Sequence, residues 1–263
     1  MSRNTNDCYK QAIVTESLKV RANANQRFGS SDFDGWIKSL VDEFSFTTVL
    51  DICCGTGNQL VMYAERPGLR NLIGVDVSVE ALATAKDRLY GKVDEEKVVL
   101  VESDMDGAFR IQAVNENSFD LVACCYGLYY SRNAEAIMDN MIGHLDPNGT
   151  LMIVGPYGKK NNASIFDVIE RHFELPELPR RSSRTFMEQE VLPFLDARMS
   201  IETRTFVNTV IFPDVEALIN YWRATTFYRK KYADAVEGDF RSEFDKEGKF
   251  VVEKHVMAAI GRI

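Results

Sequence analysis

The stretch Thr48-Val-Leu-Asp-Ile-Cys-Cys-Gly-Thr-Gly-Asn58 decides the fold class of this 263-residue chain. Its first residues form a short apolar run that predicts a buried strand over 48–53 and contains one acid, Asp51. Gly55 and Gly57 follow, and glycine allows a tight turn and a close backbone approach that a Cβ would obstruct. A glycine turn at the carboxyl end of a buried strand is typical of the edge where α/β sheets bind ligands. The stretch therefore predicts a cradle for a nucleoside-containing ligand.

Apolar runs and helical periodicity alternate along the first half of the chain. We expect further strands at 71–76, 98–102, 119–125 and 150–154, and helices at 78–90 and 134–144. Strands and helices at this spacing predict right-handed crossovers and a parallel sheet covered on both faces.

The second half of the chain has a different pattern. Helices and loops interrupted by prolines are expected over 157–198, then a strand at 200–212, helices at 214–222 and 233–246, and a strand at 250–260. Two strands that end the chain, joined by helices, suit an antiparallel hairpin that finishes an otherwise parallel sheet.

The composition is that of an ordinary folded protein, with 45% hydrophobic and 27% charged residues, and it excludes collagenous and disordered classes. The formal net charge of −8 offers no basic footprint for nucleic acid. Five cysteines are an odd count that suits a reducing compartment. The N-terminus has no apolar signal core, and no apolar run reaches the length of a membrane span. We expect a cytoplasmic protein with no membrane or nucleic-acid partner; a homodimer stays open.

The turn departs from the nicotinamide dinucleotide fingerprint. That fingerprint reads Gly-x-Gly-x-x-Gly, but its last position here is Leu60. Asp51 precedes the glycines, where a phosphate would not favour a carboxylate. The ligand is therefore expected to be cationic, and a nicotinamide oxidoreductase is a disfavoured alternative.

Residues 47–155 resemble the class I S-adenosylmethionine-dependent methyltransferases, in particular the small-molecule branch, because several spaced motifs agree. The first family motif has the form acid-x-Gly-x-Gly-x-Gly, and Asp51, Cys53, Gly55 and Gly57 stand at the corresponding places. Cys53 is the departure, although cysteine is small enough to be tolerated there. The resemblance implies that Asp51 and the loop backbone hold the methionine portion of the cofactor.

Two further motifs follow the next strands. Asp76 can accept hydrogen bonds from both ribose hydroxyls, and the family has its ribose acid there. Asp104 and Met105 lie where the family binds the exocyclic amine and the ring of adenine. The resemblance thus implies S-adenosyl-L-methionine as cofactor and S-adenosyl-L-homocysteine as product. The implied cofactor-binding residues are Asp51, Cys53, Gly55, Thr56, Gly57, Asp76, Val77, Ser103, Asp104, Met105, Cys125 and Tyr126.

The resemblance also implies the architecture. We expect an α/β fold with a seven-stranded Rossmann-like methyltransferase sheet, parallel except for an antiparallel last strand, and flanked by helices. A helical cap would come from the N-terminus and from insertions after strands five and six. The expected parts are N-terminal lid helices over 1–40, a cofactor-binding core over 41–156, and a substrate cap insertion with the last two strands over 157–263.

Methyl transfer from a sulfonium is an in-line displacement, so the enzyme mainly aligns the acceptor and excludes water. The family often has a His-His pair where this chain has Tyr129-Tyr130, which argues against a histidine base. Tyr130 is the catalytic candidate, as an orienting hydroxyl, with aromatic packing as the alternative. Asp120 is expected to be structural and His144 to end a surface helix.

The acceptor site is less well marked. The substrate-binding candidates are Tyr9, Tyr129, Arg132, Tyr157 and Trp222, with Asn161 beside Tyr157 as a further one. Arg180-Arg-Ser-Ser-Arg184 could bind a phosphate or carboxylate, since arginine matches such groups, or could be a solvated loop.

The ordered motifs favour an O- or N-methyltransferase of a small molecule, of the sugar or secondary-metabolite type. One alternative is a non-catalytic adenosylmethionine-binding partner protein. A nucleic-acid or protein methyltransferase is less favoured, because the Asn/Asp-Pro-Pro-aromatic run of the base methylases is missing after strand four. No metal is expected, because adjacent cysteines on a strand point to opposite faces.

Overall fold

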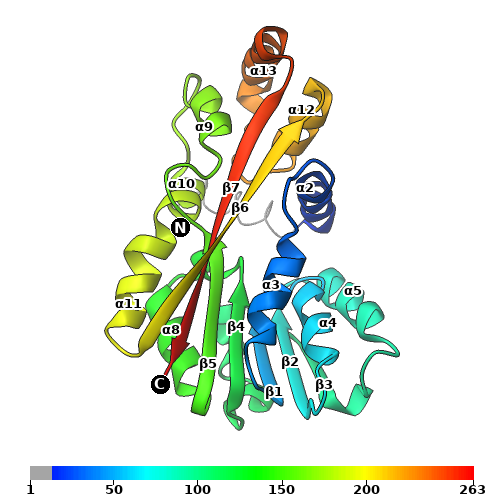
Figure 1. The fold of residues 1–263 in the computed structure, drawn as a ribbon, viewed down its shortest axis with the longest axis vertical. Helices are drawn as coiled ribbons and strands as arrows, with labels where there is room; N and C mark the ends of the chain where they lie inside the picture. Colours follow the sequence, from blue (N-terminus) through cyan, green and yellow to red (C-terminus); the bar gives the residue numbers. More distant parts are fainter. Residues whose placement is uncertain (1–13) are drawn as a thin grey trace. The chain divides into compact units, whose positions relative to one another are not determined.

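The computed structural model describes residues 14–263, and its centre is one seven-stranded sheet in the order β3-β2-β1-β4-β5-β7-β6 (Figure 1). The strands are β1 (Thr48–Ile52), β2 (Asn71–Asp76), β3 (Val98–Glu102), β4 (Phe119–Cys125), β5 (Leu145–Pro156), β6 (Ser200–Phe212) and β7 (Phe250–Arg262). β1 to β5 pair in parallel, whereas β7 runs opposite to β6. The predicted α/β sheet is confirmed.

β1 lies inside the sheet between β2 and β4, and its residues Val49, Leu50 and Ile52 are apolar and buried. Leu50 pairs with Ile73 of β2 on one side and with Val122 of β4 on the other. Val49 and Leu50 are fully buried. A continuous apolar strand is what a parallel sheet covered by helices requires.

Several helices begin at side chains that cap them. Ser78 accepts from the backbone N–H of Ala81, and Asp214 accepts from that of Ala217. The α-helices are α2 (Thr15–Arg27), α3 (Phe33–Asp42), α4 (Asn58–Ala64), α5 (Val79–Leu89), α6 (Met105–Ala108), α7 (Gln112–Asn115), α8 (Ala134–Gly143), α9 (Ala163–Ile169), α10 (Glu177–Arg184), α11 (Leu192–Asp196), α12 (Val215–Arg223) and α13 (Ala233–Glu247). Short 3₁₀ or π turns are η1 (Glu95–Lys97), η2 (Leu128–Tyr130), η3 (Met187–Val191) and η4 (Lys230–Tyr232).

One strand is longer than expected. A strand was predicted at 150–154, but β5 already begins at Leu145, which pairs with Phe119. The register shifts between Phe119 and Leu121, so the turn residues 146–149 are accommodated within the strand as an irregularity. Turn-forming residues in a sequence do not show whether a strand begins after the turn or continues through it as a bulge.

The chain divides into two units. The helical unit comprises residues up to 33, 156–187 and 205–256; the sheet unit comprises residues 34–155, 188–204 and 257–263. All predicted cofactor-binding residues belong to the sheet unit. The division into lid helices, core and substrate cap stays a prediction.

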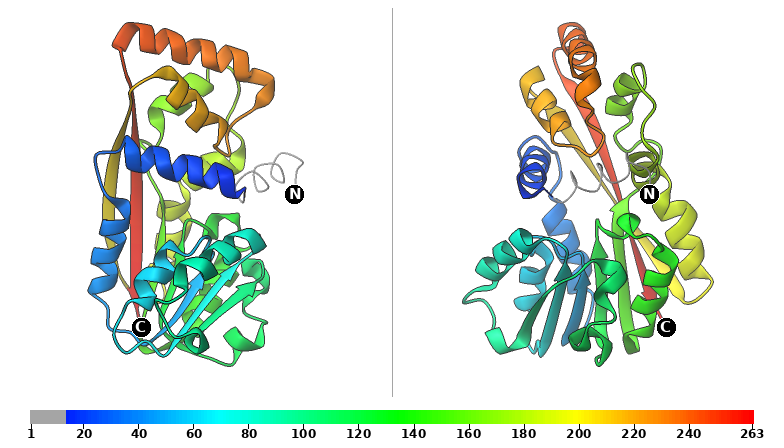
Figure 2. Two further views of the ribbon diagram at one scale, coloured as in Figure 1. Left: turned by 90° about the vertical axis from the view of Figure 1, so that its right-hand side faces the viewer. Right: turned by 180° about the vertical axis from the view of Figure 1, so that it is seen from behind.

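The helical unit has its own apolar core. Trp222 of α12, Phe240 of α13 and Val252 of β7 are among its fully buried members. The helices α2 and α12 lie side by side in this unit (Figure 2), where Arg21 donates to the carbonyl of Ala224 over 2.8 Å. No helix within residues 14–263 is long and apolar enough to cross a membrane.

Asp120 ties the start of β4 to the start of β1, as its expected structural role requires. Its carboxylate accepts from the backbone and hydroxyl of Thr47, at 2.7 and 2.9 Å, and from the backbone of Thr48 at 3.1 Å. Partial burial would raise the pKa of Asp120, but the hydrogen bonds from Thr47 and Thr48 outweigh it and lower the pKa below 3.8.

We expect Asp120→Asn to lower the free energy of unfolding by about 1–2 kcal/mol at neutral pH, because the bonds to a charged acceptor are lost. The native pKa is depressed, so this stabilisation is full above 3.8 and is lost as the pH falls through the lower native pKa. Urea unfolding at neutral and acidic pH measures both effects, with the exposed Asp87→Asn as control. An equal loss at both pH values would contradict the assignment.

Candidate functional site

The loop between β1 and α4 makes the turn expected from Gly55 and Gly57. Both glycines are left-handed, with φ of 54° and 80°. A Cβ on Gly57 would lie 2.8 Å from the Cβ of Ala85 in α5, so only glycine fits there. A Cβ on Gly55 would meet nothing within 4 Å, so at Gly55 the backbone conformation is the only constraint.

Cys53 adopts the conformation of the glycine that it replaces. Its φ is 65°, in the left-handed region, which costs a non-glycine residue about 1–3 kcal/mol. The loop therefore follows a glycine path despite the departure in the motif.

Gly127, in the loop after β4, makes room for the Cys53 side chain. A Cβ on Gly127 would lie 2.4 Å from both the Cβ and the Sγ of Cys53. Gly127 was not among the predicted site residues. Its position could have been inferred from the sequence, because a glycine follows β4 in a chain that lacks the first glycine of the motif.

Asp51 is the most unusual group of the loop region. It is 1% exposed, and neither carboxylate oxygen has a hydrogen-bond partner among the described residues. Burial, and secondarily the nearby Asp76, raises the pKa of Asp51 well above its ordinary value. A buried carboxylate without a partner is costly, so this position suits a positively charged ligand group.

Asp76 joins the end of β2 to the glycine turn. Its Oδ2 accepts from the backbone of Gly55 at 2.8 Å, and its Oδ1 accepts from that of Ser78 at 2.9 Å. Each carboxylate oxygen can accept a second hydrogen bond, so the group can still bind two hydroxyls.

The side chain of Asp104 orders the segment after β3. This residue caps α6, and its Oδ1 accepts from the backbone of Gly107 at 2.7 Å. The Ser103 hydroxyl donates to the Asp104 carbonyl, and Met105 is buried. The Oδ2 of Asp104 is the oxygen that capping leaves for an amine.

The loop after β4 carries the tyrosine candidates. Tyr126 has a φ of 60° and donates its backbone N–H to Val154. The Tyr129 hydroxyl donates to the Tyr126 carbonyl at 3.0 Å, and its ring centroid lies 4.6 Å from that of Tyr130. Tyr129 is thus engaged within the loop, Tyr130 is half-buried, and Arg132 is exposed.

The four cysteines Cys53, Cys54, Cys124 and Cys125 are free. Burial is the largest effect that raises the pKa of Cys54 and Cys125, and a hydrogen bond with Cys124 is the largest for Cys53. The raised pKa values leave the thiols of Cys53, Cys54 and Cys125 protonated. Within residues 14–263 no group of three His, Cys, Asp or Glu residues could hold a metal ion.

Predicted substrate residues in the helical unit have different positions. Tyr157 is half-buried and packs edge-on against His255, with ring centroids 6.0 Å apart. Trp222 is 0% exposed and packs against Tyr228 and Phe240. A ring without exposed surface offers no stacking face, so the predicted substrate contact of Trp222 is corrected to a packing role. Tyr9 lies outside the described residues.

Asn161 and the arginine run are also engaged. Asn161 is buried and donates to the Ser183 carbonyl. The arginine run lies in α10 rather than in a loop, where Arg180 pairs with Glu174 and Arg184 with Glu170. Because Glu174 and Glu170 already pair with Arg180 and Arg184, these two arginines are less suited to binding an anion.

The contact of Cys53 with Gly127 gives a double-mutant prediction. We expect Gly127→Ala to lower the free energy of unfolding by about 1–3 kcal/mol, because its methyl overlaps Cys53. In a Cys53→Gly background the same change should cost at least about 1 kcal/mol less. Chemical denaturation of the four proteins measures the coupling, and additive losses would contradict the contact.

Comparison with known proteins places these features in a family. Residues 49–149 match the family described as methyltransferase domain. The chain is 26% identical to the demethylmenaquinone methyltransferase of Lactobacillus johnsonii over 125 residues, 46% of this chain and 50% of that protein. It is 23% identical to the ubiquinone/menaquinone biosynthesis C-methyltransferase UbiE of Methylococcus capsulatus, over 72% of this chain and 71% of that protein. The first curated relatives are matched over half of their length or less.

Solved structures share the fold. A protein of Bacillus halodurans C-125 superposes with a TM-score of 0.61 at 17% identity, covering 86% of this chain and 97% of that one. The plantazolicin methyltransferase BamL, solved with a triazolic substrate analogue and SAH, superposes with a TM-score of 0.57 at 14% identity, covering 98% and 95%. The strand order, the glycine turn and the methyltransferase domain matched by residues 49–149 agree with the sequence resemblance to the class I S-adenosylmethionine-dependent methyltransferases.

Proposed function

We propose that this protein transfers a methyl group from S-adenosylmethionine to a small-molecule acceptor. The observation that carries the proposal is the Asp51 carboxylate, which is buried beside a left-handed glycine turn and has no partner in the described part of the chain. When bound, S-adenosylmethionine supplies a methyl group on a positively charged sulfur and presents an ammonium group that suits a buried carboxylate.

The other predicted residues bind the remaining parts of the cofactor. Asp76 accepts from the ribose hydroxyls, while Asp104 and Met105 hold adenine. Cys53, Gly55, Thr56 and Gly57 form the turn around the methionine portion, and Val77, Ser103, Cys125 and Tyr126 complete the lining. Tyr130 orients the acceptor by its hydroxyl.

The acceptor class rests on relatives and on the motifs. The curated relatives are named for quinone substrates, and the BamL structure holds a plantazolicin analogue; all are small molecules. The sequence analysis predicted transfer to oxygen or nitrogen. One relative is named as a C-methyltransferase, so a methylated carbon is the alternative outcome. Product analysis after incubation with labelled cofactor and a metabolite extract decides between them, and cofactor binding without turnover would favour a non-catalytic partner protein.

Asp76→Ala tests the ribose assignment. We expect the binding of S-adenosylhomocysteine to weaken by about 2–4 kcal/mol, because two hydrogen bonds to a charged acceptor are lost and water replaces part of them. Isothermal titration calorimetry measures the loss, with Asp94→Ala, an exposed cap of η1, as control. An unchanged affinity in a folded Asp76→Ala protein would overturn the assignment.

Asp51→Asn should separate stability from binding. The native pKa of Asp51 is raised above 3.8, so its burial increasingly destabilises the ligand-free protein as the pH rises above 3.8 toward the native pKa. At neutral pH we therefore expect the ligand-free variant to melt at a higher temperature than the wild type, yet to bind S-adenosylhomocysteine at least about tenfold more weakly.

The pH dependence of binding gives the matching control. Wild-type affinity should rise with pH as Asp51 ionises, and this dependence should vanish in Asp51→Asn. Thermal unfolding and calorimetry across the pH range measure both. A variant that is less stable without ligand, or that binds with wild-type affinity, would refute the role of Asp51.

A further inference from the structure

Lys254 of β7 carries a positive charge on the apolar face of its strand. Side chains alternate along a strand, so Lys254 shares a face with Phe250 and Val252, which are buried in the core of the helical unit. Lys254 itself is half-buried. A lysine at such a place normally pairs with an acid.

The partners of Lys254 are neutral. Its ammonium donates to the Oδ1 of Asn162 and to the hydroxyl of Tyr221, and its Nζ lies 4.6 Å from the centroid of the Tyr221 ring. Among residues 14–263 it makes no ion pair with a carboxylate. Glu253, its neighbour in sequence, lies on the opposite face and contacts the Nε2 of His255 at 2.9 Å.

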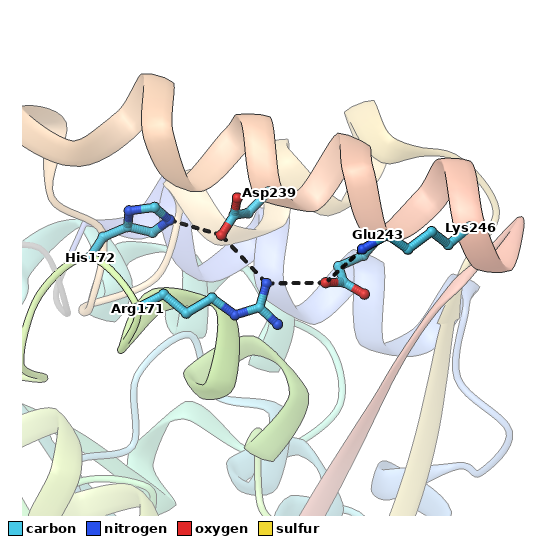
Figure 3. A network of polar contacts seen from close by, with 5 residues as sticks. All are labelled: Arg171, His172, Asp239, Glu243 and Lys246. Carbon is cyan, nitrogen blue, oxygen red and sulfur yellow. Dashed lines mark hydrogen bonds and ion pairs between the residues drawn. The ribbon is translucent and has the colours of Figure 1, made fainter.

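Two acids of the helical unit are shared among three other basic residues. Figure 3 shows Asp239 and Glu243 of α13 shared among Arg171, His172 and Lys246, with Arg171 in contact with both acids. This network balances its own charges, whereas the positive charge of Lys254 is not neutralised by a described residue. Lys254 is thus a half-buried cation that is available to an anion.

The geometry leaves one donor of Lys254 for such a ligand. An ammonium has three N–H groups, and two are used by Asn162 and Tyr221. Both partners are fixed: Tyr221 is 4% exposed, and the backbone of Asn162 donates to the Glu253 carbonyl at 2.9 Å. The ammonium is thus held in place, and its partial exposure lets the third donor reach a ligand.

We propose that Lys254 binds an anionic group, a carboxylate or a phosphate, of a small-molecule ligand of the helical unit. Asn162 and Tyr221 act as positioning residues that orient the ammonium without neutralising it. The proposal goes beyond the proposed function, because it adds an anion site in the unit that does not contain the predicted cofactor-binding residues.

Ligand-observed NMR titrations with benzoate, phenyl phosphate and benzamide test the proposal, because these probes share a phenyl ring and differ in charge. We expect benzoate or phenyl phosphate to bind the wild type at least about tenfold more tightly than neutral benzamide. The anion that binds more tightly identifies the group. Lys254→Gln, which keeps hydrogen-bonding capacity without the charge, should abolish the preference, while Lys254→Arg should retain it. Lys249→Met, which removes an exposed lysine from the same unit, should change nothing.

The outcomes separate this proposal from the proposed function. Calorimetry with S-adenosylhomocysteine on the same samples reports the cofactor site independently. Cofactor binding with no anion preference in the wild type, or with the preference retained in a folded Lys254→Gln protein, would overturn the role of Lys254 alone. Anion preference without cofactor binding would support the anion site and count against the methyltransferase activity. If Lys254→Gln does not fold by circular dichroism, Lys254→Met replaces it.

Discussion

A buried carboxylate that has no hydrogen-bond partner among residues 14–263 is the constraint on which the sheet unit depends. Asp51 lies in β1, in register with Gly74 of β2 and Ala123 of β4, so its strand neighbours are small. An apolar side chain at position 51 would satisfy the sheet better, since burying a charge is costly. The free-energy cost of burying the Asp51 carboxylate therefore falls where β1 ends and the turn begins. This is expected where a sequence favours binding of a cationic ligand over stability.

The glycine turn shows how a departure from a motif can be compensated elsewhere. Position 53 needs a left-handed backbone, and Cys53 adopts it although cysteine disfavours it. The side chain that glycine would lack is accommodated because Gly127 has no Cβ. Asp76 then fixes the turn from the other side through the backbone of Gly55. The path of the loop is thus determined by contacts from the ends of β2 and β4 together with the glycines of the loop itself.

Local patterns were sufficient to predict most of the fold. The strands at 71–76, 98–102, 119–125 and 200–212 have the predicted bounds, because apolar runs and strand ends are local properties. Ser78 and Asp214 cap their helices for the same reason.

Features that depend on distant contacts were not predictable. The periodicity of α12 marks Trp222 as apolar but cannot tell a core face from a ligand face. The pairing of the α10 arginines with Glu170 and Glu174, and the neutral surroundings of Lys254, arise only when separate segments meet. The room that Gly127 leaves for Cys53 has the same origin.

The most direct test of the role of the buried carboxylate compares two ligands of the wild-type protein by calorimetry. S-adenosylhomocysteine carries an ammonium group, whereas 5′-methylthioadenosine keeps the nucleoside and sulfur but lacks the amino-acid portion. If Asp51 awaits a cationic group, S-adenosylhomocysteine should bind at least about tenfold more tightly than methylthioadenosine, and NADH should bind more weakly than S-adenosylhomocysteine. Equal affinities for the first two ligands, or tighter binding of NADH, would contradict the account.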